Sequence, residues 1–342
     1  MSAETPVRYP RPLQPGDRIG VTSPSSGVGT RHLARLEASV LLLTDLGYDV
    51  RVGRCMDGAS HVSAPAADRA AELQELLLDP EVRAVVPPWG GETAIDLVPL
   101  LDWAALAEAE PTWLVGYSDL STLLVPLTLL TGTATLHGSN LMDTPYSVPP
   151  PLLHWLDVAT GRAGERFRQA SAGVSRRGEW DDWTAEPAIR ERRWNGDGGW
   201  VRLDSGTEPV DVQGRLIGGC IETLGPLAGT PFADVRRLPG PRIVYVEAAE
   251  DPAFAVCRAL HGMRLAGFFD DAVAVLVGRT DAPDAPTMTQ HEAVRDALLP
   301  LGVPIIGEVD CGHVPPQAAL VNGALAHLVF SDERAFVEQS LV

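Results

Sequence analysis

The stretch WLVGYSDLSTLLVPLTLL, residues 113–130, joins two hydrophobic periodicities at a short polar break. Residues 112–115 fit a buried strand, whereas leucines from Leu120 to Leu130 recur on one helical stripe. Ser118 is therefore predicted on a sharp strand-to-helix turn, which can expose its hydroxyl above a sheet beside the free N–H groups of the helix. The alternative is that Ser118 only caps the helix.

Composition indicates a globular chain of 342 residues, 45% hydrophobic and 21% charged, long enough for two domains. We expect a cytoplasmic location, because the sequence has neither an eighteen-residue apolar run nor a signal-peptide pattern. The net charge of −18 repels phosphate backbones and anionic lipid, so nucleic acid and membranes are not expected partners. A small-molecule or peptide substrate is expected instead.

The four cysteines show no C-x-x-C spacing. This pattern argues against a structural zinc site and against a disulfide framework, so reduced thiols are expected. The four are Cys55, Cys220, Cys257 and Cys311.

Residues 1–160 alternate predicted strands and helices. RIGVTSPSS, YDVRVG and VRAVVP fit strands, and HLARLEASVLLLTDLG and APAADRAAELQELLLD fit helices. Such alternation predicts an α/β domain with a mainly parallel sheet covered by helices, whose ligands bind beyond the carboxyl ends of the strands.

Residues 161–210 lack sustained periodicity, and are predicted to be either a solvated linker or a substrate-binding loop. The second interpretation draws on five aromatic rings, at Phe167, Trp180, Trp183, Trp194 and Trp200.

Residues 211–342 contain further strands, a helix that begins near Asp251-Pro252 and ends at Gly267, and a predicted hairpin that turns at Asn322-Gly323. This pattern predicts a β-rich second domain, either α+β or barrel-like.

A nucleophilic serine needs a base and an acid that orients the base. His137 and His313 each follow a strand beside glycine, and His313 is preferred because a rigid Gly/Pro-bounded loop holds it. Glu247 ends the apolar run IVYV, where a carboxylate needs a partner such as a histidine N–H. The alternative for each residue is a satisfied polar group at a strand end.

The paired glycines of PWGGE, residues 88–92, follow a predicted strand and allow close backbone approach. An N–H group there, with that of Asp119, would form a two-donor oxyanion hole. Phosphate binding is less favoured, because neither a P-loop lysine nor G-x-G-x-x-G is present.

Nearly the whole chain resembles the LD-carboxypeptidase family of serine peptidases, including its microcin C self-immunity branch. The resemblance is carried in family order by GDRIGVTSPSS, VRAVVPPWGGETAID, GYSD, GRLIGGCIETLGPLAGTPF, YVEAAEDP and GHVPPQAALVNGA. It implies a flavodoxin-like N-terminal domain, a smaller C-terminal domain, a site between them and a homodimer.

The resemblance implies a cofactor-independent and metal-independent peptidase. Ser118 would attack, His313 would transfer protons and Glu247 would orient His313. Backbone N–H groups near Gly91 and Asp119 would hold the oxyanion.

Substrate contacts are also implied by the resemblance, at Gly90, Glu92, Trp180, Trp183 and Cys220. The family commonly has asparagine where this chain has Cys220. A loop tryptophan from EWDDW would stack on the base of an aminoacyl nucleotide, with Trp183 preferred over Trp180.

The expected function is hydrolysis of an amide bond in a small peptide-like or aminoacyl-nucleotide substrate, as in microcin C detoxification and antibiotic resistance. A muropeptide LD-carboxypeptidase that releases terminal D-alanine is the alternative within the family. Two other classes stay open: a non-catalytic ligand-binding protein, and a metallohydrolase with Glu308, Asp310 and His313 as ligands.

Overall fold

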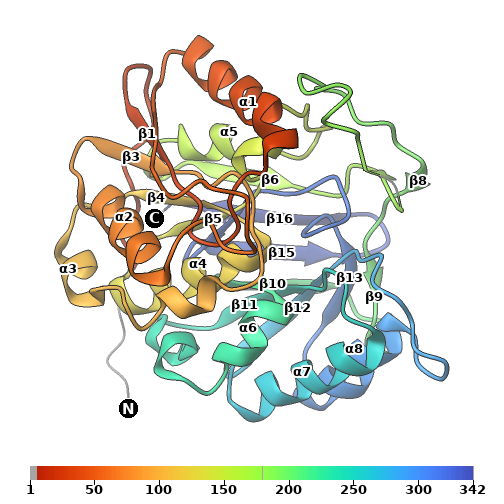
Figure 1. The fold of residues 1–342 in the computed structure, drawn as a ribbon. Coiled ribbons are helices and arrows are strands. Elements are labelled where there is room, and N and C mark those ends of the chain that lie inside the picture. Colours follow the sequence, from red (N-terminus) through yellow and green to blue (C-terminus); the bar gives the residue numbers. More distant parts are fainter. Residues whose placement is uncertain (1–5, 179, 342) are drawn as a thin grey trace.

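Two sheets, each accompanied by helices, form the fold of the computed structural model, which describes residues 6–178 and 180–341 (Figure 1). No helix of these residues is both long and apolar enough to cross a lipid bilayer.

The first sheet has the strand order β14-β5-β4-β3-β1-β2. Its five N-terminal strands run parallel, which confirms the predicted α/β domain, and only β14 runs antiparallel to its neighbour. The strands are β1 (Arg18–Val21), β2 (Asp49–Val52), β3 (Val82–Val85), β4 (Trp113–Gly116), β5 (Thr135–His137) and β14 (Leu320–Asn322). The helices are α1 (Leu33–Asp45), α2 (Ala66–Leu78), α3 (Trp103–Glu108), α4 (Ser121–Thr131) and α5 (Trp155–Ala159).

The second sheet has the order β6-β16-β15-β10-β11-β12-β13-β9, which confirms a sheet-rich second domain. Its strands are β6 (Arg166–Gln169), β9 (Val201–Arg202), β10 (Val210–Cys220), β11 (Arg242–Glu247), β12 (Ala272–Gly278), β13 (Ile305–Val309), β15 (Leu325–Phe330) and β16 (Ala335–Ser340). The helices are α6 (Ile221–Leu224), α7 (Ala253–Leu265) and α8 (Gln290–Leu298). Strands β7 (Val174–Ser175) and β8 (Gly196–Asp197) pair separately.

The second sheet is open rather than barrel-like, with β6 and β9 at its edges. Strands β10 to β13 run parallel, and α7 and α8 connect the last three of them, because parallel neighbours need long crossovers. The segment 161–210 contributes both edge strands. The boundaries at 160 and 210 stay predictions.

The predicted hairpin at Asn322-Gly323 is wrong. Strand β14 pairs with β5 in the first sheet, whereas β15 pairs with β10 and β16 in the second. Gly323, with a φ of +90°, turns the chain from one sheet to the other. The Asn322 amide joins the sheets, since its oxygen accepts from Gly218 N–H (3.0 Å) and its nitrogen donates to Thr135 Oγ1 (3.2 Å).

Helix α4 lies between the two sheets and packs against both β5 and β10. Nearly every side chain of α4 is buried, including residues outside the predicted leucine stripe. A helix that is apolar on all sides belongs in a core. Its burial fixes the turn that precedes it.

Candidate active site

Ser118 begins the short 3₁₀ turn between β4 and α4 and has a φ of +66°. A left-handed backbone is uncommon for a residue with a side chain and costs about 1–3 kcal/mol, so the surrounding packing must hold it. Gly116 permits this packing, because a Cβ there would lie 2.3 Å from Leu120 Cδ1 and 2.6 Å from Asn140 Oδ1. The predicted sharp turn at Ser118 is therefore present.

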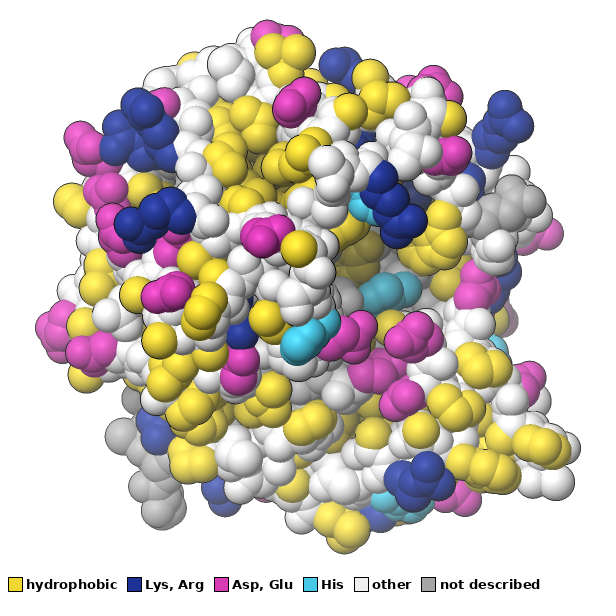
Figure 2. Space-filling view, viewed as in Figure 1, with side chains coloured by type: hydrophobic (Ala, Val, Ile, Leu, Met, Phe, Trp, Pro, Cys, Tyr) yellow, Lys and Arg dark blue, Asp and Glu magenta, His cyan; other side chains and the backbone are white. Residues whose placement is uncertain are grey.

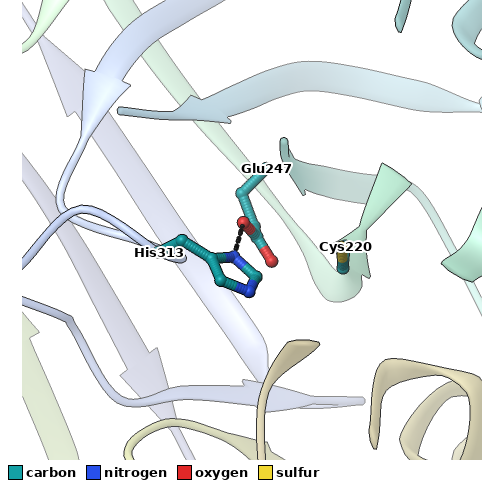
Figure 3. A group of neighbouring side chains, drawn as sticks. All are labelled: Cys220, Glu247 and His313. Carbon is teal, nitrogen blue, oxygen red and sulfur yellow. Dashed lines mark hydrogen bonds and ion pairs between the residues drawn. The ribbon is translucent and has the colours of Figure 1, made fainter. Parts of the chain in front are cut away.

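The structure brings Ser118, His313 and Glu247 into one hydrogen-bonded chain. His313 Nδ1 lies 2.8 Å from Glu247 Oε2, and His313 Nε2 lies 3.0 Å from Ser118 Oγ. Because a carboxylate only accepts, the Nδ1–H form donates to Glu247 and leaves Nε2 free to accept from the serine hydroxyl. Glu247 is the last residue of β11 and His313 lies in the loop after β13 (Figure 3).

Electrostatics couple Glu247 to His313. Full burial acts to raise the pKa of Glu247, but the charge and hydrogen bond of His313 outweigh it and hold the pKa below its usual value. Burial acts to lower the pKa of His313, yet the Glu247 carboxylate outweighs it and raises the pKa above its usual value. The buried carboxylate thus stabilises the protonated imidazole.

Gly90 brings the turn after β3 against the serine turn. A Cβ on Gly90 would lie 2.8 Å from Ser118 Cβ and 3.0 Å from the Asp119 backbone nitrogen, so only glycine allows this approach. The Asp119 carboxylate strengthens the contact by accepting from Ser25 Oγ (2.5 Å) and from Ala94 N–H (2.7 Å). The backbone around residues 90–91 and 118–119 therefore converges beside the serine hydroxyl.

Ser118 and His313 line a cavity of about 410 Å³. Gly91, Glu92, Trp180 and Cys220, all predicted substrate contacts or oxyanion donors, line it too. Figure 2 shows a hollow on this face with histidine side chains in it and acidic side chains gathered beside it.

Trp180 and Trp183, the two rings considered for stacking on a base, lie in different places relative to this cavity, and the preference for Trp183 stays a prediction that the lining of the cavity does not favour. Trp180 lines the cavity and is 67% exposed. Trp183 instead donates from Nε1 to Tyr146 Oη (2.7 Å) and packs against the hydrophobic core of the first sheet. The Arg35 guanidinium lies over the Trp183 ring, 5.0 Å from the centre of that ring. Alternation within an irregular loop gives no sign of which ring faces inward.

Sequence reasoning missed four charged residues of the cavity, Arg176, Glu222, Glu250 and Asp281, of which the first two have the most informative partners. Arg176 is 5% exposed and bonds Asp181 at 2.6 Å, while its Nε has no partner among the described residues. Glu222 accepts from the N–H groups of residues 249–251 at 2.7–3.2 Å and so shapes the loop after β11. The position of Glu222 two residues after Cys220, at a strand end, could have indicated it.

The metallohydrolase interpretation, with Glu308, Asp310 and His313 as ligands, is wrong. Glu308 pairs with Arg177, at 2.7 Å, and with His291. Asp310 accepts from Trp200 Nε1, at 2.9 Å, and pairs with the buried Arg279. These partners hold the two carboxylates in networks of their own, away from the His313 relay.

His137, the other candidate base, is 1% exposed. Its ring packs edge-on against Tyr245 at 5.3 Å, and burial lowers the pKa of His137 to about 4. His137 is thus a neutral histidine of the core, and it is not one of the described residues that line the cavity.

A serine on a strained strand-to-helix turn, bonded through histidine to a buried acid, is the arrangement of a serine hydrolase. Two family models match the chain: the LD-carboxypeptidase N-terminal domain over residues 19–138 and the LD-carboxypeptidase C-terminal domain over residues 213–328. The chain belongs to the LD-carboxypeptidase family of serine peptidases.

Relatives within the family differ in what their names say they act on. The chain is 23% identical to the microcin C7 self-immunity protein MccF of Escherichia coli, over 96% of this chain and 95% of that protein. It is 26% identical to the murein tetrapeptide carboxypeptidase of Pseudomonas aeruginosa, over 92% and 94%.

The fold matches that of MccF bound to aspartyl sulfamoyl adenosine, with a TM-score of 0.82, 22% identity and coverage of 97% of this chain and 98% of that one. It also matches an MccF-like protein from Streptococcus pneumoniae in complex with AMP, with a TM-score of 0.74, 21% identity and coverage of 95% and 99%.

Proposed function

We propose that this protein hydrolyses an amide bond in a small substrate, with Ser118 as nucleophile, His313 as general base and acid, and Glu247 as the residue that orients and charges His313. The observation that carries the proposal is the continuous chain of 3.0 Å and 2.8 Å contacts from the serine hydroxyl to the buried carboxylate. A cap role for Ser118 does not account for that chain, since helix capping requires neither histidine nor a buried acid.

The reaction begins when His313 Nε2 takes the Ser118 proton and Oγ attacks the carbonyl carbon. The oxyanion is held by the backbone N–H groups of Gly91 and Asp119, which lie beside the serine turn. His313 then returns its proton to the leaving nitrogen, and an acyl-enzyme forms. Water, activated by the same imidazole, releases the acid and regenerates the serine.

The substrate that we propose first is an aminoacyl nucleotide or a close analogue, as in detoxification of a microcin C-type antibiotic. Solved MccF complexes hold aspartyl sulfamoyl adenosine and glutamyl sulfamoyl guanosine. Trp180 offers a flat exposed ring at the wall of the cavity, and a base stacked on such a ring gains about 1–3 kcal/mol.

Murein tetrapeptide is the second candidate, because a relative covering almost the whole chain is named for it. Arg176 is the lining side chain suited to a terminal carboxylate, as a guanidinium with an unpartnered Nε. Glu92 and Glu250 on the same cavity favour a substrate that also carries an amine.

One experiment separates these substrates from each other and from a non-catalytic role. The purified chain is incubated with an aminoacyl sulfamoyl adenosine and, separately, with murein tetrapeptide, and product masses are measured. Release of the amino acid from the first supports the proposal, and loss of alanine from the second replaces it with the carboxypeptidase alternative. Tight binding of either without any product supports the ligand-binding class. The homodimer and the cytoplasmic location stay predictions.

A further inference from the structure

Cys220, Glu247 and His313 bring thiol, carboxylate and imidazole ligand atoms within 4.8 Å of one another (Figure 3). Cys220 and Glu247 are the last residues of β10 and β11, and they lie side by side as register partners on these parallel strands. We propose that these three side chains form a binding site for Zn²⁺, and that the bound ion switches the hydrolase off. The binding step stands on this cluster alone, and only the inhibition rests on the proposed function.

The spacing suits zinc. Zn–S bonds of about 2.3 Å and Zn–N or Zn–O bonds of about 2.0–2.1 Å place tetrahedral ligand atoms about 3.3–3.6 Å apart. The histidine and glutamate atoms lie 2.8 Å apart and the thiol lies within 4.8 Å of both, so a bound ion would move the first pair slightly apart and the thiol inward. Three protein ligands leave the fourth position to water from the cavity.

A second observation points to a missing ligand at this place. Glu247 is fully buried, and its Oε1 atom has no hydrogen-bond partner in the described structure. A buried carboxylate oxygen without a partner is costly, and a cation beside it would remove the cost.

Charge around the thiol also favours a cation. Glu222 Oε2 lies 3.1 Å from Cys220 Sγ. Burial and the neighbouring carboxylates Glu247 and Glu222 raise the pKa of Cys220 well above its usual value. A zinc ion bound beside these carboxylates would compensate the negative charge that a thiolate ligand adds.

The site can be reached from solvent, because Cys220 and His313 line the cavity that holds Ser118. On binding, Cys220 loses its thiol proton to solvent, and the proton on His313 Nδ1 moves to Nε2, so that Nδ1 gives its lone pair to the metal while Nε2–H can no longer accept a proton. The ion then replaces the Glu247–His313 hydrogen bond. Since His313 can no longer exchange a proton with Ser118, hydrolysis stops.

A second cluster supplies the matched control. Cys257 and His261 of α7 and Asp296 of α8 also bring ligand atoms within 4.8 Å of one another. Arg264 Nη2 lies 3.3 Å from His261 Nδ1 there, so a fixed positive charge opposes a cation. We expect this cluster to bind zinc more weakly than the cavity cluster.

The test measures binding of Zn²⁺ to chelator-treated full-length protein by competition with a chromogenic chelator. Cys220→Ala and Cys220→Ser should each weaken binding at least about 100-fold, since even indirect partners of a metal site contribute 10–100-fold. Cys257→Ala should keep the wild-type affinity. Affinity should rise from pH 6 to pH 8, and Mg²⁺, which prefers oxygen ligands, should not compete.

Ser118→Ala separates this proposal from the proposed function. Ser118 is not a ligand, so this variant should bind zinc like the wild type even though it cannot hydrolyse. In the wild type, zinc should inhibit hydrolysis with the same half-saturation as binding, and a chelator should restore the rate. Unchanged zinc affinity in folded Cys220→Ala and Cys220→Ser, or loss of binding in Cys257→Ala alone, overturns the proposal.

Discussion

Replacing Glu247 by glutamine keeps the shape of the orienting side chain and removes its charge. His313 Nδ1 lies 2.8 Å from the carboxylate of a fully buried residue. Two unit charges about 4 Å apart interact by about 4 kcal/mol at an effective dielectric of about 20, which corresponds to about 10³ in rate when the imidazolium forms only in the transition state.

Tautomerism adds to this loss. Glu247 Oε1 has no hydrogen-bond partner among the described residues, so no second contact fixes which end of a glutamine amide faces His313. When the NH₂ end donates to Nδ1, the ring proton moves to Nε2, and the ring cannot accept the Ser118 proton. We expect kcat to fall by about 10³- to 10⁴-fold in Glu247→Gln, with little change in KM.

The assay is steady-state hydrolysis of the substrate identified by product mass, with folding checked by thermal unfolding. Glu72→Gln is the matched control: Glu72 is 4% exposed and accepts from Thr22 Oγ1 at 2.7 Å, but it does not line the cavity among the described residues. That variant should lose stability and keep kcat within about threefold, as expected for a change outside the site. A Glu247→Gln enzyme with near-normal kcat would refute the orienting role.

Three further predictions concern the pH profile and the cavity walls. Because the pKa of His313 is raised and only the neutral ring accepts a proton, kcat/KM should fall as the pH drops through a midpoint above 6.5, and an acidic limb centred below 6 would contradict this coupling. Trp180→Ala should weaken kcat/KM for a nucleotide substrate about 5- to 150-fold and barely affect a peptide, whereas Trp183→Ala should lower the melting temperature; equal loss on both substrates in Trp180→Ala would exclude base stacking. Gly90→Ala should fold but lower kcat by about 5- to 150-fold, the effect of about 1–3 kcal/mol of overpacking at the serine turn, and a fully active variant would show that this turn tolerates a Cβ.

Local signals allowed the sequence to predict much of this fold. Gly267, the predicted end of a helix, follows α7 with a φ of +86°, and Gly47, the last residue of the predicted helical stretch HLARLEASVLLLTDLG, follows α1 with a φ of +92°. The run 113–130 is a strand, a turn and a helix as its periodicity indicates. Such features are set by interactions between residues that are close together in the sequence, so a short stretch of sequence is enough to predict them.

Long-range pairing explains what the sequence did not predict. Asn322-Gly323 carries a strong local hairpin signal, but pairing of β14 with β5, nearly two hundred positions earlier, overrides it. Trp180 and Trp183 have the same local setting, and only distant partners such as Tyr146 and Arg35 decide which ring turns inward. The position of Arg176 in the cavity wall is likewise set by the path of an irregular loop, which has no periodic sequence pattern.

Ser118→Ala tests the proposed mechanism most directly. The change removes one oxygen at a turn that packing already holds, so the variant should keep the wild-type melting temperature within a few degrees. Ser39→Ala controls for loss of a hydroxyl, because it removes another buried serine, whose hydroxyl donates to Arg35 O on its own helix and to no other group in the described part of the chain. We predict that kcat/KM falls by at least about 10³-fold in Ser118→Ala and stays near the wild-type value in Ser39→Ala. A folded Ser118→Ala enzyme that retains more than a tenth of the wild-type rate would contradict the assignment of Ser118 as nucleophile.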